Sequence, residues 1–217
     1  MIPVREKREM LFFNRIPVMI QDKPNYNIEG ILGKLQKTLP QQLVTGLDYI
    51  LISKSNYMQD REVEAIYKDG IIYMTPEMED TNEALLSMVH EIAHLIEEEH
   101  PDIYLDETIE TEFIGKRNKL EQILIAHDID TQGQDFQKTE YCEKFDDFLY
   151  LQVGYPVLRG LASGLFLSPY AATSVREYFA DAFEEYFIRD SKYVKLISPS
   201  VYFKIEELVE NLGEKNT

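Results

Sequence analysis

The segment His90-Glu91-Ile92-Ala93-His94 constrains the fold of this chain more than any other feature of its sequence. Residues four apart lie on one face of an α-helix, so a helix here would present the imidazoles of His90 and His94 to one metal ion. Glu91 would then lie beside this pair, where its carboxylate can take a proton from water. The spacing therefore predicts a helix with two metal ligands and a base. The alternative is an amphipathic helix with two surface histidines.

This helix is predicted to span residues 81–100. Thr81 or Asn82 can cap its start, and Pro101 ends it. The acidic run Glu97–Glu99 is expected to form a solvent-exposed helix end. Apolar residues recur at helical spacing and predict a buried stripe: Leu85, Leu86, Val89, Ile92, Ala93 and Ile96.

A catalytic zinc site needs a third protein ligand, and two residues could provide it. His100 stands where the metzincin pattern H-E-x-x-H-x-x-G-x-x-H has its last histidine. Glu97, however, occupies the glycine position of that pattern. Metzincins also need a methionine turn after the motif, whereas all seven methionines of this chain precede His90. His100 is therefore expected to be a helix-end residue, and the metzincin site stays an alternative.

The other ligand candidate is Glu177, on a second predicted helix that Thr173 or Ser174 can cap. Glu177 and Asp181 are one helical turn apart, so they share a face and can point at the same site. A glutamate facing the two histidines completes a His₂Glu set with an open fourth position for water.

Two segments carry a resemblance to a known family. The first is Ser168-Pro169-Tyr170, and the second, which begins seven residues after the tyrosine, is Glu177-Tyr178-Phe179-Ala180-Asp181-Ala182-Phe183. Together they resemble the active-site segment of the zinc metallopeptidases related to anthrax lethal factor and the Pro-Pro endopeptidases. These are gluzincin-type enzymes. The specific motifs lie within residues 81–100 and 168–187. Asp181 stands where the family usually has a glutamate, and the resemblance implies that it orients a ligand histidine.

The resemblance also implies roles for the other motif residues. His90, His94 and Glu177 would hold one zinc ion, and Glu91 would act as general base. Tyr170 would donate a hydrogen bond to the oxyanion that forms when a peptide carbonyl is attacked. A phenol suits this role because it ordinarily keeps its proton at neutral pH.

Length and composition limit the remaining possibilities. A chain of 217 residues suits a single domain, here residues 1–217, with an α/β front layer (1–80), the motif helix (81–100) and a helical part (101–217). The net charge of −17 argues against nucleic acid and anionic membranes as partners and leaves peptides or proteins as substrates. No apolar run is long enough to cross a membrane.

A cytoplasmic location is expected, because the N-terminal residues lack the hydrophobic stretch of a signal peptide and Cys142 is the only cysteine. Delivery by a phage particle or by non-classical export stays open. We assign no role to His127 or Cys142.

Patterns of apolar and turn residues predict the other elements. Strands are expected at residues 15–21 and 47–53, and a hairpin is expected at residues 63–75 around the turn Lys68-Asp69-Gly70. An edge strand of this hairpin could accept an extended substrate as one more strand, or be a plain sheet edge. Helices are expected at residues 26–39, 106–127, 139–152 and 200–212, and a loop at residues 154–170.

Together these features predict an α+β, zincin-like fold. A small mixed sheet with an edge hairpin would pack on the motif helix, and a mainly helical C-terminal part would follow. The predicted function is that of a zinc-dependent endopeptidase. The alternatives are a metzincin-type peptidase with His100 as ligand, and an inactive protein in which zinc is structural.

Overall fold

The computed structural model describes residues 10–54 and 63–214 of the chain. The chain divides into two compact units, Met1–Ile96 and Glu97–Thr217. Among the described residues, the first contains a small mixed sheet and the α-helices α1 and α3, and the second is almost entirely helical. The predicted α+β class with a mainly helical C-terminal part is therefore confirmed.

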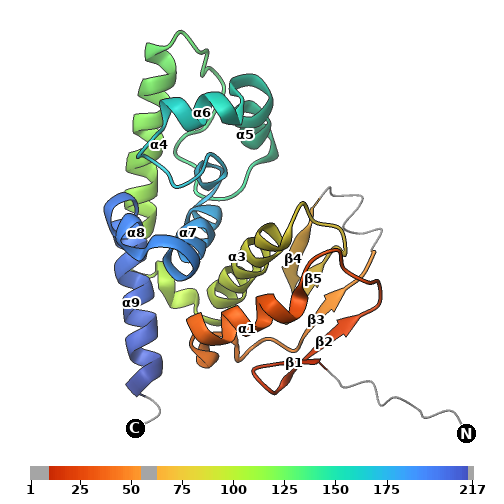
Figure 1. Cartoon of the computed structure of the whole chain (residues 1–217). Coiled ribbons are helices and arrows are strands. Elements are labelled where there is room, and N and C mark those ends of the chain that lie inside the picture. Colours follow the sequence, from red (N-terminus) through yellow and green to blue (C-terminus); the bar gives the residue numbers. More distant parts are fainter. Residues whose placement is uncertain (1–9, 55–62, 215–217) are drawn as a thin grey trace, which may run out of the picture. The chain divides into compact units, whose positions relative to one another are not determined.

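The sheet of the first unit has five strands in the order β1-β2-β3-β5-β4 (Figure 1). Their bounds are Met10–Phe12 (β1), Ile16–Ile20 (β2), Tyr49–Ile52 (β3), Ala65–Lys68 (β4) and Ile71–Met74 (β5). The central strands β2, β3 and β5 run parallel, and β1 and β4 add to the two edges in antiparallel orientation. The predicted hairpin β4–β5 thus forms one edge of the sheet.

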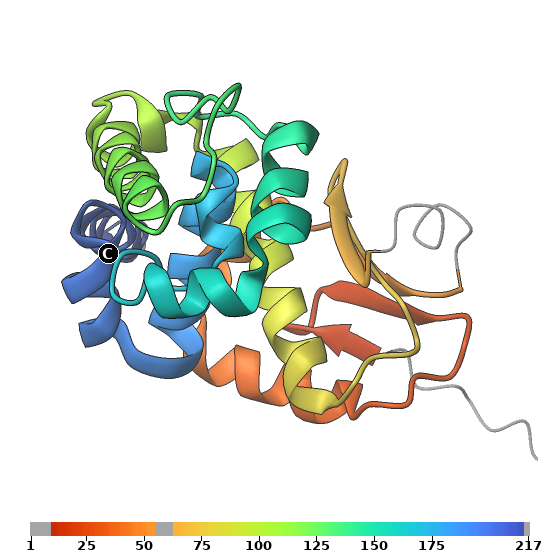
Figure 2. The same ribbon diagram turned by 90° about the horizontal axis from the view of Figure 1, so that it is seen from above.

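One face of the sheet forms the core of this unit. Val18 pairs with Ile50, and Ile50 with Ile72, so that alternate residues of three neighbouring strands align on this face. All three side chains are buried. Figures 1 and 2 show helices α1 (Ile28–Thr38) and α3 (Thr81–Glu99) on the same side of the sheet. The apolar stripe of α3 is buried as predicted except at Leu86, which is half-buried.

The predicted strands and the first helix are confirmed with shifts of one or two residues at their ends. In the hairpin turn, Asp69 and Gly70 have φ angles of 49° and 79°, the left-handed conformations that a tight Asp-Gly turn requires. Strand β1 was not predicted, because its three residues are too few to form a recognisable alternation.

The second unit consists of helices, and the longest connection between them covers residues 127–142. The α-helices are α4 (Thr108–Ala126), α5 (Glu143–Asp147), α6 (Tyr155–Leu161), α7 (Val175–Glu185), α8 (Ser191–Ile197) and α9 (Pro199–Glu214). The 3₁₀-helices are η2 (Pro101–Tyr104) and η4 (Tyr170–Ala172), and the π-helical turns are η3 (Phe148–Val153) and η5 (Tyr186–Asp190). The predicted helix at residues 106–127 corresponds to α4.

Two predictions for this unit are wrong in part. The predicted loop at residues 154–170 contains α6, which starts after Gly154 (φ 88°) and has a proline in its first turn. This position tolerates proline because the first N–H groups of a helix need no intrahelical partner. The predicted helix at 139–152 begins later, at Glu143, and widens into η3. The last helix starts at Pro199 and continues past Gly213.

A buried arginine fixes the segment between α4 and α5. Arg117 on α4 is 1% exposed, and its guanidinium donates to the backbone carbonyls of Asp135 and Lys138. It also lies 3.7 Å from the ring centroid of Phe145. Burial lowers the pKa of Arg117 to about 10. Two carbonyls and an aromatic face therefore replace the water around this charge.

Candidate metal centre

Helix α3 carries the histidine motif and begins one residue after its cap. Asp80 Oδ1 accepts hydrogen bonds from the N–H groups of Asn82 and Glu83, at 2.7 and 2.9 Å. The prediction that Thr81 or Asn82 caps this helix is therefore wrong. Aspartate is as good a cap as either, and its negative charge also favours the positive end of the helix dipole.

His90 and His94 lie on one face of α3, as the spacing predicts. Their ring centroids are 5.0 Å apart, and the rings are inclined by 84°. Zinc–nitrogen bonds of about 2.0–2.1 Å at about tetrahedral angles place two imidazole centroids about 5 Å apart. The pair therefore has the donor type and the spacing to bind one zinc ion.

Glu91 lies between the histidines in sequence and is 8% exposed. The backbone N–H of Tyr67, in the edge strand β4, donates to its Oε2. Its other oxygen, Oε1, has no hydrogen-bond partner among the described residues. A carboxylate that is fixed at one oxygen keeps the second oxygen available to accept a proton.

The acidic end of α3 differs from the prediction. Glu98 and Glu99 are exposed, but Glu97 is buried. The hydroxyl of Tyr104 donates to Glu97 Oε1, and Arg176 Nε lies 3.3 Å from Glu97 Oε2. Burial and the charge of Glu97 raise the pKa of Tyr104. Glu97 therefore holds the last turn of α3 to the start of α7 within the second unit.

His100 follows the last residue of α3 and precedes η2, so it is the helix-end residue that was expected. Helix α3 passes through Glu97 without a break and continues to Glu99. In the metzincin pattern the helix turns at this position, which is why that pattern has glycine there. The backbone thus lacks the turn that would bring His100 back to the two histidines.

Helix α7 carries the other proposed ligand. Ser174 is its cap, as predicted, with its hydroxyl oxygen accepting from the N–H of Glu177 at 3.2 Å. Tyr178, Phe179, Ala182 and Phe183 are buried, so this side of α7 faces the core of the second unit. Glu177 and Asp181 are half-buried and one turn apart.

Tyr170 begins the short helix η4 and is 36% exposed. Ser168 Oγ accepts from the N–H of Ala171, and the Thr173 hydroxyl donates to the carbonyl of Tyr170, so the backbone here is fixed on both sides. The pKa of Tyr155, at the start of α6, is raised mainly by burial and by Asp146, and to a smaller extent by Tyr170. The two phenols are thus neighbours within the second unit.

Two groups of described residues have the donor types to hold a metal ion. One consists of His90, His94 and Glu177, the set proposed from the sequence, and the other of His90, Asp181 and Glu184. His100 belongs to neither group. Glu184 was not singled out from the sequence, although its position three residues after Asp181 on the same helix was a usable signal.

Comparisons of the chain with known protein families, with curated proteins and with solved structures found no match. The family resemblance therefore rests on the motifs quoted above and stays a prediction. Among the described residues, every helix is too short or too polar to cross a membrane.

Proposed function

We propose that this protein is a zinc-dependent endopeptidase with a zincin-like fold. The observation that carries the proposal is the arrangement on α3, where two imidazoles at a zinc-binding spacing flank a buried glutamate, one of whose oxygens has no hydrogen-bond partner among the described residues. A purely structural zinc site has no use for such a carboxylate, because its ligands fill all four positions.

Glu177 is the proposed third ligand. Glu97 lies three residues after His94, less than one turn along α3, and its carboxylate pairs with Arg176, the residue before Glu177. The donor set would then be two histidines and one glutamate, which suits zinc and leaves a fourth position for water.

When bound, zinc would lower the pKa of a water molecule and polarise the peptide carbonyl. Glu91 would accept the water's proton on its Oε1 while the Tyr67 N–H holds its Oε2, and would later pass the proton to the leaving amine. The phenolic hydroxyl of Tyr170 would donate a hydrogen bond to the oxyanion.

Asp181 would accept the second ring N–H of a ligand histidine and so fix its orientation. The edge strand β4 would bind an extended peptide as one more strand, since it is the last strand at its end of the described sheet.

Metal analysis after dialysis tests the ligand set. Wild-type protein should retain one zinc ion per chain, Glu177→Ala should lose most of it, and the matched control His100→Ala should retain it. Equal zinc content in the Glu177 variant and the wild type would refute the assignment. Loss of zinc from the His100 variant would favour the metzincin alternative.

A digest of a peptide library tests the activity separately. Cleavage by the zinc-loaded wild type that chelation abolishes would support the peptidase. If zinc binds as proposed and no peptide is cleaved, the alternative of a binding or structural protein is favoured.

A further inference from the structure

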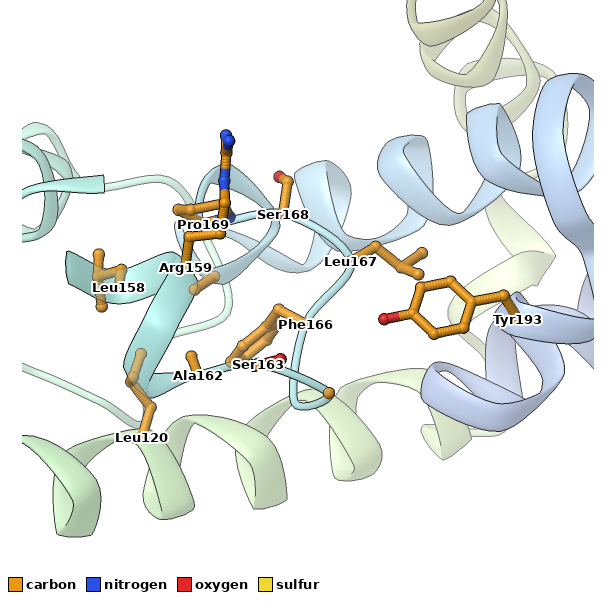
Figure 3. Close-up of a pocket in the computed structure, with 12 residues that line it drawn as sticks. Leu120, Leu158, Arg159, Ala162, Ser163, Phe166, Leu167, Ser168, Pro169 and Tyr193 are labelled. Carbon is orange, nitrogen blue, oxygen red and sulfur yellow. The ribbon is translucent and has the colours of Figure 1, made fainter. Parts of the chain in front are cut away.

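A pocket lies within the second unit, next to the segment that leads to Tyr170 (Figure 3). Its volume is about 120 Å³. The apolar lining comes mainly from Leu120, Leu158, Ala162, Phe166 and Leu167, and the polar lining residues are Arg159, Ser163, Ser168 and Tyr193. An apolar interior with a few polar groups is the usual composition of a site for a small organic ligand.

Among the polar lining residues, Arg159 indicates which kind of ligand the pocket would bind. It is exposed and has no hydrogen bond or ion pair with any other residue that the structure describes. The other arginines within residues 10–54 and 63–214 all have such partners, either carbonyls or carboxylates. In a chain with 39 acidic and 22 basic residues, an arginine without an acidic partner is available to an anion from outside.

Ser168 provides a second donor on the same side of the pocket. In Figure 3 the side chains of Arg159 and Ser168 extend to the same side, away from Leu120 and Phe166, so both donors lie at the edge of the apolar lining. The oxygen of the Ser168 hydroxyl accepts from the N–H of Ala171, which leaves its hydrogen to donate to a ligand. An anion held by these two residues would contact the turn on which Tyr170 lies.

The volume limits the size of the apolar part. An apolar cavity of about 150 Å³ is known to hold one benzene molecule, so this slightly smaller but open pocket suits a single ring or a chain of about six carbons. Leu167, which is half-buried, would contact that part, and burial of its exposed atoms would favour binding.

We propose that this pocket binds a small amphipathic carboxylic acid, with its apolar part in the pocket and its carboxylate on Arg159 and Ser168. The acid could be a free aromatic or aliphatic acid, or the C-terminal residue of a peptide. Binding would hold the segment from Ser168 to Tyr170 in place. It requires neither zinc nor the proposed peptidase activity.

Calorimetric titration of the full-length protein with phenylacetate tests this proposal, with phenethylamine as a probe of similar size and opposite charge. Phenylacetate should bind and phenethylamine should not. Arg159→Gln should weaken phenylacetate binding about threefold to fivefold, as expected for one exposed ion pair. Lys192→Gln, which removes an exposed charge next in sequence to Tyr193 but not in the pocket lining, should leave binding unchanged.

Ala162→Met should abolish binding by filling the pocket, and a melting curve would verify that this variant folds. Hydrogen exchange of the Ala171 amide should slow when phenylacetate is added. Equal binding of the acid and the amine, or undiminished binding to both the Arg159 and the Ala162 variants, would overturn the proposal. A phenylalanine-ending peptide that binds tighter than phenylacetate, and loses this affinity on amidation, would identify a peptide terminus as the ligand. Weaker binding would identify the free acid.

Discussion

Replacement of Glu91 by glutamine separates the proposed chemistry from metal binding and folding. The amide has nearly the same shape as the carboxylate, and its oxygen can still accept the hydrogen bond from the Tyr67 N–H. It cannot accept a proton from water. Loss of a general base costs about 10²–10⁴ in rate, or about 3–5 kcal/mol in the activation free energy.

The cost in stability should be much smaller. A hydrogen bond to a charged acceptor contributes about 1.5–3 kcal/mol and one to a neutral acceptor about 0.5–1.5, so Glu91→Gln should lose about 1 kcal/mol. For a chain of this size, that lowers the melting temperature by about 2–4 °C. The variant therefore stays folded at 25 °C, and any large loss of activity must come from the chemistry.

The assay is mass-spectrometric analysis of a peptide-library digest, at matched zinc content, with a melting curve for each protein. Glu98→Gln is the matched control, because Glu98 lies exposed on the same helix. It should retain full activity. Wild-type turnover in Glu91→Gln would refute the general-base role.

Three further predictions concern the second unit. Tyr170→Phe should lower kcat about a hundredfold, or about 3 kcal/mol, with KM and zinc content unchanged; a wild-type kcat with a lower melting temperature would instead make Tyr170 a packing residue. Arg117→Ala should lower the free energy of unfolding by about 3–5 kcal/mol, because a buried cavity and two unpaired carbonyls replace the guanidinium. Urea titrations measure this change, and a change below about 1 kcal/mol would contradict the prediction. Burial lowers the pKa of Lys116 from 10.5 to about 8, so between these pH values the unfolded chain binds more protons than the folded chain, and the free energy of unfolding should rise with pH. Lys116→Met should lack that rise, and an equal rise in both proteins would exclude Lys116 as its source.

The elements that were predicted correctly depend on local patterns. The spacing of His90 and His94 defines a helix face, and the Asp-Gly turn defines the β4–β5 hairpin, without reference to distant residues. The single helix predicted at residues 139–152 was wrong in part because apolar periodicity does not distinguish α-helical from π-helical turns. Gly154 and Pro156 indicated a loop, whereas they are the residue before α6 and a residue of its first turn.

Glu97 could not be interpreted correctly from local sequence. Its neighbours Glu98 and Glu99 are exposed, and nothing near it in the sequence indicates burial. Its ion-pair partner, Arg176, lies 79 residues away. A buried carboxylate needs such partners, because desolvation without them costs several kcal/mol. The pairing is therefore a property of the tertiary fold alone.

The same ion pair also bears on the choice between the two proposed third ligands. Arg176 has a side chain that is 57% exposed, whereas the side chain of Glu97 is only 4% exposed, so the exposed arginine extends over the buried carboxylate. Had position 97 been glycine, as the metzincin pattern requires, the helix could have ended there and Arg176 would have had no acidic partner at that position. A glutamate at 97 instead continues α3 and binds the first turn of α7. One residue thus disfavours His100 as a ligand and supports the helix that carries Glu177.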